Sequence, residues 1–386
     1  MAMGSPTPTS SPRSAPRGAV HRRLGRTAGS APEDARRANR SLVLQALHHG
    51  GPASRAELAK VLHVTPATVS TIVRDLLDEE IVEELGRSTV RNVGKPATMI
   101  DIRGDGRLIA VVDCSPQHHF VGALVDLSGR VAHRHDWPRD DRTGDEALVL
   151  LRTIVADLVE RAERPLLGVG VASPGYVDEA GVVADAAHLG WKRVDLPLEL
   201  PAGAVHAFND ANAAALSELT FGPRDSQDLI VVRVDEGIGA GLVLDGRLHS
   251  GPNGGGGEIG HVVVDPDGQL CACGATGCLE TVVRASLLRE QLAEGGDRDD
   301  ALAAAGTALG RAISMLVSAL DVSDIVVSGS EEITDDSFRE GVLAGLTERV
   351  SHDLAGQLAV RHTAAASSDV LLGAAALVLD RELDLR

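Results

Sequence analysis

The chemistry of this chain is concentrated in one stretch, which reads Gly254-Gly255-Gly256-Gly257-Glu258-Ile259-Gly260-His261 and, after a gap of nine residues, Cys271-Ala272-Cys273-Gly274-Ala275-Thr276-Gly277-Cys278-Leu279-Glu280. Three of the four cysteines in the chain lie here. One imidazole nitrogen and three thiolates complete the tetrahedral shell of a zinc ion and leave no position open for water. The stretch therefore predicts a structural zinc (Zn2+) site with four ligands: His261, Cys271, Cys273 and Cys278. The alternative is a group of buried, inert thiols beside a glycine-rich loop.

The same stretch resembles the zinc signature of the ROK family, which contains sugar repressors and sugar kinases. The resemblance is carried by Gly260-His261, the nine-residue gap and the pattern CxCGxxGCxE, and the run Gly237-Ile238-Gly239-Ala240-Gly241-Leu242 extends it upstream. It covers the chain from about Asp105 to the C-terminus. The resemblance implies an α/β fold of the two-lobed, actin-like ATPase and sugar kinase type over residues 105–386. Lobe 1 is then expected at about 105–207 together with the C-terminal helix, and lobe 2 at about 208–365.

Length and composition exclude several other classes of protein. With 386 residues, of which 44% are hydrophobic, the chain is long enough for two or three packed domains. It shows neither the apolar core of a signal peptide nor an apolar run long enough to cross a bilayer. We therefore expect a cytoplasmic protein with no membrane partner, in which thiols stay reduced and available to a metal. The fourth cysteine, Cys114, lies in an apolar run and is expected in the core.

Charge is distributed unevenly along the sequence. Residues 1–104 contain 15 basic and 10 acidic side chains, whereas the remainder contains 22 basic and 45 acidic ones, so a net charge of +5 is followed by one of −23. A basic N-terminal part followed by an acidic remainder indicates that the N-terminal part binds a polyanion. Residues 1–33 are rich in Ser, Pro, Thr, Ala and Arg and are expected to form a disordered basic tail, which either touches DNA phosphates or is simply solvated.

Residues 34–103 have the pattern of a winged helix-turn-helix. Three helices are expected, at about Ala35–His49, Arg55–Leu62 and Pro66–Glu80. Ser54 is a good N-cap for the second helix, and Thr65 followed by a proline is a good start for the third. The third helix carries an apolar stripe at helical spacing, and it would be the one that enters the major groove of DNA.

Two strands, at Ile81–Leu85 and Thr98–Ile102, flank a basic, glycine-containing segment that is expected to form the wing. Arginine and lysine side chains of such a wing suit the negative potential of a minor groove. The outward residues of the third helix are small and polar, as close approach to base edges requires. The predicted DNA-binding residues are Arg55, Thr65, Ala67, Thr68, Ser70, Thr71, Arg74, Arg87, Arg91 and Lys95. The alternative use of such a domain is contact with a partner protein.

Three segments depart from the phosphate-binding loops of the ROK kinases. After the first buried strand the chain reads Asp113-Cys114-Ser115-Pro116-Gln117-His118, in which a proline removes a backbone donor where the kinases have glycines and a threonine. The second segment, Asp235-Glu236-Gly237, sets a carboxylate against a triphosphate, and the third, Ser328-Gly329-Ser330, replaces a glycine cluster. The resemblance together with these departures predicts that the protein is not an enzyme and has no catalytic residues.

The residues that correspond to the sugar site of the family are better preserved. The segment Phe208-Asn209-Asp210-Ala211-Asn212 resembles the family's Asn-Asp-Ala-Asn motif. The resemblance implies that five side chains bind a sugar: Asn209, Asp210, Glu258, His261 and Glu280. The pair Asn209-Asp210 is also a plausible helix N-cap, and the two roles are compatible. Where the family often has asparagine-leucine, this chain has His188-Leu189, so we expect a sugar other than glucose or N-acetylglucosamine.

These features together predict a sequence-specific DNA-binding transcriptional regulator, and in particular a repressor of carbohydrate uptake or catabolism genes. Its effector would be a sugar or sugar phosphate bound between the lobes. A homodimer or higher homo-oligomer would place two winged helices on a pseudo-palindromic double-stranded DNA operator. One alternative is an ATP-dependent sugar kinase that carries a DNA-binding appendage. The other is a scaffold that binds a protein partner through its winged helix.

Overall fold

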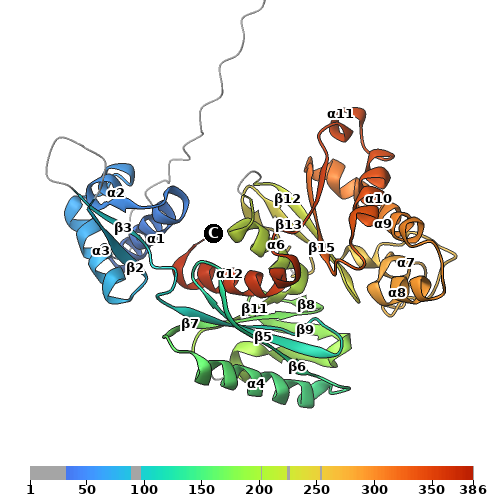
Figure 1. The fold of residues 1–386 in the computed structure, drawn as a ribbon, viewed down its shortest axis with the longest axis horizontal. Helices are drawn as coiled ribbons and strands as arrows, with labels where there is room; N and C mark the ends of the chain where they lie inside the picture. Colours follow the sequence, from blue (N-terminus) through green and yellow to red (C-terminus); the bar gives the residue numbers. More distant parts are fainter. Residues whose placement is uncertain (1–31, 88–96, 201, 224–226, 253, 386) are drawn as a thin grey trace, which may run out of the picture.

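The computed structural model describes residues 32–87, 97–200, 202–223, 227–252 and 254–385. Figure 1 shows an N-terminal domain beside a larger body of two lobes, with helix α12 (Asp369–Leu383) between them. The predicted tail up to residue 31 lies outside the described residues, as do Arg91 and Lys95 of the predicted wing. The fold confirms the predicted class, an N-terminal winged helix-turn-helix followed by a two-lobed α/β body.

In the described residues, the N-terminal domain contains three helices and a small sheet of strand order β1-β3-β2. Its elements are α1 (Pro32–Gly50), β1 (Ala53–Ser54), α2 (Arg55–Val61), α3 (Pro66–Asp78), β2 (Val82–Arg87) and β3 (Thr98–Ile102). Ser54 caps α2 in a full capping box with Glu57, and the Thr65 hydroxyl accepts a hydrogen bond from the main-chain N of Thr68 at 3.1 Å. Helix α1 begins at Pro32, inside the predicted tail, because proline suits the first helical position.

Lobe 1 is built on a five-stranded sheet of order β11-β7-β4-β5-β6. Its strands are β4 (Leu108–Asp113), β5 (His119–Asp126), β6 (Val131–Pro138), β7 (Leu166–Ser173) and β11 (Val205–Asn209). Strands β4, β5 and β6 form an antiparallel meander, whereas β7 and β11 run parallel to β4. All residues of β4 are buried, because helix α4 (Gly144–Arg161) covers one face of the sheet and α12 covers the other.

A second, smaller sheet of order β10-β9-β8 extends lobe 1 toward lobe 2. Its elements, with the short helices that follow its strands, are β8 (Tyr176–Val177), β9 (Val182–Ala186), the 3-10 turn η1 (Ala187–Leu189), β10 (Trp191–Asp195) and α5 (Leu196–Glu199). The buried ring of Trp191 donates from Nε1 to the Gly144 carbonyl oxygen at 3.0 Å, which ties this sheet to the start of α4.

Lobe 2 repeats the topology of lobe 1, with the strand order β14-β13-β12-β15-β16. Its strands are β12 (Leu229–Val234), β13 (Ile238–Leu244), β14 (Arg247–Leu248), β15 (Asp324–Gly329) and β16 (Ala359–His362). Three antiparallel strands are again followed by two parallel ones. Its helices are α7 (Glu280–Val283), α8 (Ala285–Ala293), α9 (Arg298–Leu320), α10 (Asp336–Thr347) and α11 (His352–Ala355).

Helices α9 and α10 approach each other through glycines. A Cβ on Gly306 or Gly310 of α9 would lie 2.1 or 2.2 Å from a carbonyl oxygen of α10, and one on Gly341 or Gly345 of α10 would lie 2.2 or 2.3 Å from one of α9. By length and composition α9 could cross a membrane, contrary to the expectation from the sequence. Its apolar side chains, such as Leu309, are instead part of the buried core of lobe 2.

Helices α6 (Asp210–Phe221) and α12 lie against each other between the two sheets (Figure 1). Helix α6 packs on β12 and β13 of lobe 2, and α12 packs on β4, β7 and β11 of lobe 1. A Cβ on Gly373 of α12 would lie 1.7 Å from the carbonyl oxygen of Ala213 in α6. Only glycine permits this approach, so the contact between the lobes depends on it.

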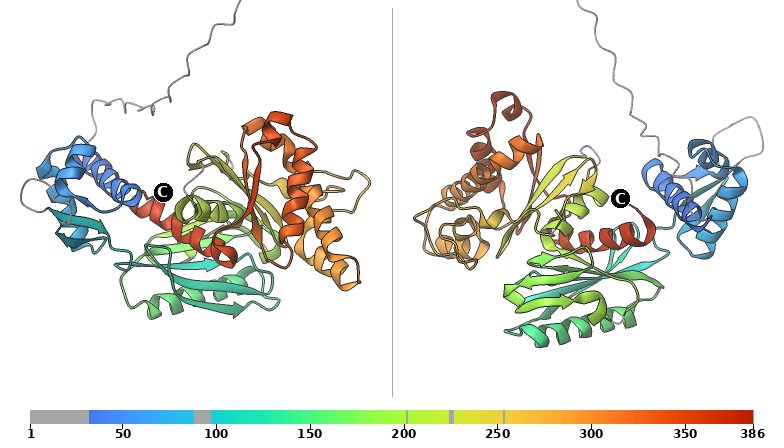
Figure 2. Two further views of the ribbon diagram at one scale, coloured as in Figure 1. Left: turned by 45° about the horizontal axis from the view of Figure 1, so that its top comes forward. Right: turned by 180° about the vertical axis from the view of Figure 1, so that it is seen from behind.

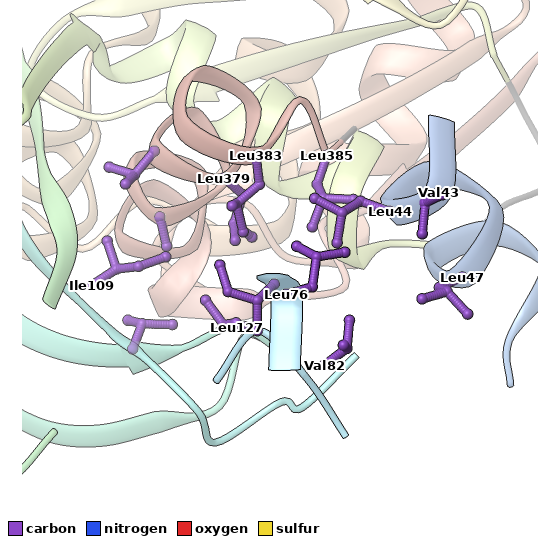
Figure 3. Close-up of a cluster of buried hydrophobic side chains, with 14 of the residues drawn as sticks. Val43, Leu44, Leu47, Leu76, Val82, Ile109, Leu127, Leu379, Leu383 and Leu385 are labelled. Atoms are coloured by element: carbon purple, nitrogen blue, oxygen red, sulfur yellow. The ribbon is translucent and has the colours of Figure 1, made fainter. Parts of the chain in front are cut away.

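The C-terminal end of α12 holds the N-terminal domain. One buried cluster shared by the two contains Val43, Leu44, Leu47, Leu379, Leu383 and Leu385 (Figure 3). Beside this cluster the Ser41 hydroxyl of α1 donates to a carboxylate oxygen of Asp384, and Gln45 Nε2 donates to the main-chain oxygen of Asp384 at 3.1 Å. Both views of Figure 2 show α1 next to the end of α12.

Candidate functional site

A cavity of about 460 Å³ lies between the lobes. Lobe 1 contributes the segment after β4 and the segments around the small β8–β10 sheet, and lobe 2 contributes the β12–β13 turn and the cysteine-containing loop. The cavity brings together all five predicted sugar-binding side chains, which are Asn209, Asp210, Glu258, His261 and Glu280. We call this cavity the effector cleft.

The four predicted metal ligands converge beside the effector cleft. The donor atoms of His261, Cys271, Cys273 and Cys278 all lie within 4.8 Å of one another. Cys271 Sγ is 3.6 Å from His261 Nδ1, and Cys273 Sγ is 3.6 Å from Cys278 Sγ. In a tetrahedral zinc site with bonds of about 2.0–2.3 Å the donor atoms are separated by roughly 3.5–3.8 Å. The group could therefore hold a metal ion; the donor set suits zinc, and these two separations match a tetrahedral zinc shell.

Backbone geometry shapes the loop that carries these ligands. Gly277 has a φ of +73°, and a Cβ at this position would lie 1.4 Å from the carbonyl oxygen of Asp265. His261 ends a short 3-10 turn, η2 (Ile259–His261). Its Nδ1 faces the thiols while the same side chain lines the effector cleft. The metal loop and the effector cleft thus share one residue.

Asn209 has a structural role that the sequence already suggested. Its Oδ1 accepts hydrogen bonds from the main-chain N of Ala211 at 2.9 Å and of Asn212 at 3.2 Å, which caps α6. Its Nδ2 donates to the carbonyl oxygen of Gly175 at 2.9 Å. These bonds fix the end of β11 at the wall of the effector cleft, where Asn209 also faces the cavity.

Arg233 of β12 is the centre of a buried ion-pair cluster beside Asp210. Its Nε donates to Asp210 Oδ2 at 3.2 Å, its Nη2 to Asp235 Oδ2 at 2.8 Å, and its Nη1 lies 3.8 Å from Asp369 Oδ1 at the start of α12. Nη2 also donates to Ser115 Oγ in lobe 1 at 3.2 Å. The cluster therefore joins β12, α6, α12 and the segment after β4.

The electrostatics of the cluster follow from burial and proximity. Burial works against the charge of Arg233, yet the neighbouring carboxylates, that of Asp235 first, raise its pKa above the ordinary value. Burial raises the pKa of Asp113 to about 6 and also raises that of Asp210, although Arg233 opposes both shifts. The side chain of Arg233 is only 9% exposed, so water screens these charges weakly.

Glu258 and Glu280 supply further carboxyl groups to the effector cleft. Burial raises the pKa of Glu258 to about 7, and the nearby Asp210 and Glu280 act in the same direction. Oε2 of Glu280 lies 3.3 Å from the place of a Cβ on Gly260, so a side chain there would crowd the carboxylate. A carboxyl group that is partly protonated near neutral pH both donates to and accepts from hydroxyl groups.

The sequence did not reveal three further side chains of the effector cleft, Tyr176, Arg139 and Arg233. Tyr176 is 39% exposed, and its ring lies 2.7 Å from the place of a Cβ on Gly255. A partly exposed aromatic ring can cover the apolar face of a sugar. The signal available in the sequence was that Tyr176 is the sole tyrosine of the chain and directly follows the turn-forming run Ser173-Pro174-Gly175.

The segments at the positions of the phosphate loops are engaged in internal contacts. The main-chain N and Oγ of Ser115 donate to Asp113 Oδ1 at 2.9 and 2.6 Å, so the segment after β4 folds back on its own carboxylate. In lobe 2 the Glu236 carboxylate pairs with Arg289 at 3.3 Å. The hydroxyl of Ser328 in β15 donates to Asp369.

The predicted DNA-reading face of α3 is largely open. Thr65, Ala67, Ser70, Thr71 and Arg74 are exposed, and Thr68 is half-buried with its hydroxyl against that of Thr65 at 2.8 Å. Arg55 of α2 forms an ion pair with Glu84 at 2.9 Å. To bind a DNA phosphate, the Arg55 guanidinium group would have to leave this pair. Arg87 is the last residue of β2.

Comparison with family models defines the class. Residues 115–381 match the model of the ROK family, and residues 38–85 match that of the MarR family. The first match spans most of the chain and contains the effector cleft and the metal loop. The chain therefore belongs to the ROK family and carries a MarR-type winged-helix domain at its N-terminal end.

Two curated relatives of the chain are named as transcriptional regulators or repressors. It is 27% identical over 342 residues to the DNA-binding transcriptional dual regulator NagC of Escherichia coli strain K12, which covers 77% of this chain and 81% of the relative. It is 31% identical over 284 residues to a putative xylose repressor of a Caldicellulosiruptor species, with 68% of each chain covered.

Solved structures confirm the fold. A ROK family transcriptional regulator, described as a homologue of the E. coli MLC protein, superposes with a TM-score of 0.74 at 22% identity, covering 91% of this chain and 99% of the other. A ROK family glucokinase from Streptomyces griseus, in complex with glucose and AMPPNP, gives a TM-score of 0.61 at 24% identity and covers 69% of this chain and 98% of its own. The two-lobed body is thus a fold that regulators and kinases share.

Proposed function

We propose that the protein is a sugar-controlled transcriptional repressor that binds an operator in double-stranded DNA near genes for carbohydrate uptake or catabolism. The observation that carries the proposal is the course of α12. Asp369, the first residue of α12, faces Arg233 beside the effector cleft. Asp384, which directly follows α12, accepts a hydrogen bond from the Ser41 hydroxyl of the winged-helix domain. One helix therefore touches both the site for a small molecule and the domain for DNA.

The regulatory names of the curated relatives support the same function. NagC and the xylose repressors are named as DNA-binding regulators or repressors. The exposed small and polar residues of α3 suit a helix that lies in a major groove. We propose that Thr65, Ala67, Thr68, Ser70, Thr71 and Arg74 face the groove, and that Arg55, Arg87, Arg91 and Lys95 meet the DNA backbone or minor groove. A regulator of this kind works in the cytoplasm as a homodimer on a two-fold operator.

In this proposal a sugar or sugar phosphate binds in the effector cleft through Asn209, Asp210, Glu258, His261 and Glu280. Closure of the two lobes on the ligand would move lobe 2 relative to lobe 1. Because Arg233 contacts both Ser115 of lobe 1 and Asp369 of α12, such a movement would strain the attachment of α12, and with it the orientation of α1. Binding energy is thereby converted into a change in DNA affinity.

We further propose that the metal ion is zinc and that its role is structural. His261, Cys271, Cys273 and Cys278 would hold it, and four protein ligands leave no position for a substrate. When bound, the ion would stabilise the short loop and fix the ring of His261 against the effector cleft. Metal analysis of protein purified without added zinc tests this, with about one zinc per chain expected.

We propose that the protein is not a kinase. The internal contacts of Asp113 with Ser115 and of Glu236 with Arg289 support this, because they occupy groups that would have to face a triphosphate. The kinase alternative predicts sugar phosphorylation with magnesium-ATP. A sugar panel assayed for phosphorylated product should show no turnover, and turnover near that of ordinary sugar kinases would contradict the proposal.

The regulatory function is tested by recovery of operator DNA. Purified protein is incubated with sheared genomic DNA of its source organism, and the bound fragments are sequenced. We expect enrichment of a two-fold-symmetric site beside sugar transport or catabolic genes. Absence of enrichment over bulk DNA, with folded and metal-loaded protein, would refute the proposal. The scaffold alternative predicts that DNA affinity shows no steep dependence on salt.

Arg74→Ala provides a matched check of the proposed face. It should weaken operator binding and lower the slope of log affinity against log salt by about one if Arg74 contacts a phosphate. Arg311→Ala, an exposed arginine on α9 far from α3, should leave both quantities unchanged. Equal effects of the two substitutions would mean that the exposed face of α3 is not the DNA-reading face.

A further inference from the structure

The effector cleft is strongly acidic. The carboxylates that line it are those of Asp185, Asp210, Asp235, Glu236, Glu258 and Glu280. Among the residues that the structure describes, only two guanidinium groups, those of Arg139 and Arg233, line it as well. Two further carboxylates, Asp113 and Asp369, act on Arg233 from beside the cavity. Even with Glu258 partly protonated and Glu236 paired with Arg289, the remaining carboxylates outnumber the two guanidinium groups, so the cleft has a net negative charge at neutral pH.

Arg233 is not available to a ligand anion. Three edges of its guanidinium group face Asp210, Asp235 and Asp369, and one Nη2 hydrogen is directed to Ser115 Oγ. The side chain is only 9% exposed, so it cannot swing out without breaking several of these contacts. A phosphate that approached Arg233 would instead meet the carboxylates that surround it.

Arg139 is committed to the backbone of lobe 1. It is 6% exposed, and its Nε donates to the Gln117 carbonyl oxygen at 3.0 Å. Its Nη1 donates to the Arg142 carbonyl oxygen at 2.5 Å. Through these bonds it fixes the segment after β4 to the loop before α4. Within the part of the chain that the structure describes, it is the one cation of the cleft that no carboxylate neutralises, so it needs a direct test.

We infer that the effector is an uncharged sugar and that this cleft rejects sugar phosphates. The inference rests on the proposed function and narrows its ligand class. A phosphate dianion in a cavity lined by carboxylates is repelled by several times the thermal energy for each close carboxylate, even at an effective dielectric constant of about 20. Neutral hydroxyl groups, in contrast, find carboxylate acceptors, the second ring nitrogen of His261 and the ring of Tyr176.

The test compares each free sugar with its own phosphate ester on the full chain by titration calorimetry at fixed salt and pH 7.5. Suitable pairs are D-glucose with glucose 6-phosphate, N-acetylglucosamine with its 6-phosphate, D-mannose with its 6-phosphate, and D-xylose with its 5-phosphate. We expect that at least one free sugar binds and that its phosphate binds roughly 100-fold more weakly or not at all. A phosphate that binds as tightly as its free sugar, or more tightly, would overturn the inference and leave the proposed function standing.

Other outcomes distinguish a failure of the proposed function from a failure of the inference about the ligand class. If no member of these pairs binds or changes operator affinity, and no sugar or sugar phosphate of a wider panel of pentoses, hexoses, amino sugars and disaccharides does so either, the sugar-controlled function itself is wrong and the inference falls with it. If a phosphate binds and Arg139→Gln abolishes that binding, Arg139 is an anion site and the inference is wrong for that reason.

Substitutions that remove carboxylates from the effector cleft test whether its acidic charge is the reason that it binds free sugars and rejects sugar phosphates. The double substitution Asp235→Asn with Glu236→Gln should narrow the ratio of free-sugar to phosphate affinity by roughly 10-fold or more. Asp299→Asn, an exposed carboxylate on α9 away from the cleft, should leave the ratio unchanged. A ratio that stays the same in the double variant, with the free sugar still bound, would show that cleft charge is not what excludes the phosphate.

Discussion

Arg233 illustrates how much of the molecule depends on single buried charges. Replacing it with glutamine would leave Asp210, Asp235 and Asp369 in a poorly solvated site without a counter-charge. Breaking a buried ion pair from one side costs about 3–5 kcal/mol, so Arg233→Gln should lower the free energy of unfolding by that amount. Urea unfolding at pH 7.5 measures it. Arg311→Gln, which removes an exposed pair with Glu348, is the matched control and should change little.

The loss of stability caused by Arg233→Gln should increase with pH. The pKa of Asp113 in the folded protein, about 6, lies above its ordinary value, so folding favours the protonated carboxyl and stability falls as pH rises through about 6. Arg233 lowers this pKa, and its removal would raise it further. The loss of stability in Arg233→Gln should therefore be larger at pH 8 than at pH 5. A loss that is the same at both pH values would contradict this account of the cluster.

The metal ligands give a second prediction for single residues. Cys278→Ala should lose the bound metal and lower the melting temperature, because four ligands close the shell and three hold zinc far more weakly. Cys114→Ala also removes a buried thiol, but Cys114 lies outside the metal group, so zinc content should stay at about one per chain. Zinc is measured by atomic emission after dialysis. Retention of zinc in Cys278→Ala would exclude the proposed ligand set.

Functional residues could be predicted from the sequence where their partners lie close to them along the chain, and not where the partners come from distant segments. The metal group was predictable because its four ligands fall within one short stretch and their spacing is itself the signal. Arg233 gave no such signal. Its partners Asp210 and Asp369 come from other elements, and within the run of β12 it looks like an isolated charge in an apolar strand. Only the packing of α6, β12 and α12 brings these groups together.

Secondary-structure elements were predictable where local chemistry marks their ends. Ser54 and Thr65 cap α2 and α3 as expected, and β3 runs over Thr98–Ile102 as the sequence predicted. The sequence over residues 336–358 predicts one continuous helix, and this prediction was wrong. Ser351 starts a separate short helix, α11, by accepting from Leu354 N, so residues 348–351 break the run. The charged run from Glu294 to Asp300 predicts a break followed by a helix from Ala301, but Asp297 caps α9, which already begins at Arg298.

The packing of α12 on α6 makes a prediction about one element. Gly373→Ala places a methyl group 1.7 Å from the Ala213 carbonyl oxygen, which the helices can accept only by moving apart. Overpacking of this kind costs about 2–3 kcal/mol, and it should also lower DNA affinity because α12 carries the N-terminal domain. Gly356→Ala, where the nearest atom is 3.8 Å away, is the control for an added methyl group. Thermal unfolding compares the two, and equal stability would refute the close helix contact.

At the scale of the whole molecule, the fold class was predictable and the arrangement of its parts was not. The two-lobed α/β body follows from the family resemblance, but no local pattern indicates that α12 ends against α1. The cluster of Leu44 with Leu383 joins residues more than three hundred positions apart in the chain. Contacts of such separation depend on the complete fold, so they have no signature in a short window of sequence.

The attachment of the N-terminal domain to α12 predicts how sugar and DNA are coupled. In Ser41→Ala combined with Gln45→Ala, the two hydrogen bonds to Asp384 are lost while the effector cleft is untouched. Sugar affinity without DNA should stay the same, whereas the factor by which sugar changes operator affinity should fall toward one. Thr347→Ala, an exposed position on α10, should keep the full factor.

Reciprocity provides an independent check of this coupling. Operator DNA must change sugar affinity by the same factor by which sugar changes DNA affinity. Titrations of sugar with and without operator therefore give a second value of the factor, which should agree with the first in the parent protein and in the double variant. One sugar affinity under both conditions in the parent protein would mean that α12 does not transmit the signal.

The position of the sole tyrosine makes the effector cleft visible to spectroscopy. Growth on 3-fluorotyrosine would place one fluorine nucleus in each chain, on the ring of Tyr176, at the wall of the cleft. A 19F spectrum would then contain a single resonance that reports on the ring's surroundings without further assignment. Its shift on addition of a sugar, and its splitting into two signals under slow exchange, would give occupancy and opening rate in the intact protein while operator DNA is bound.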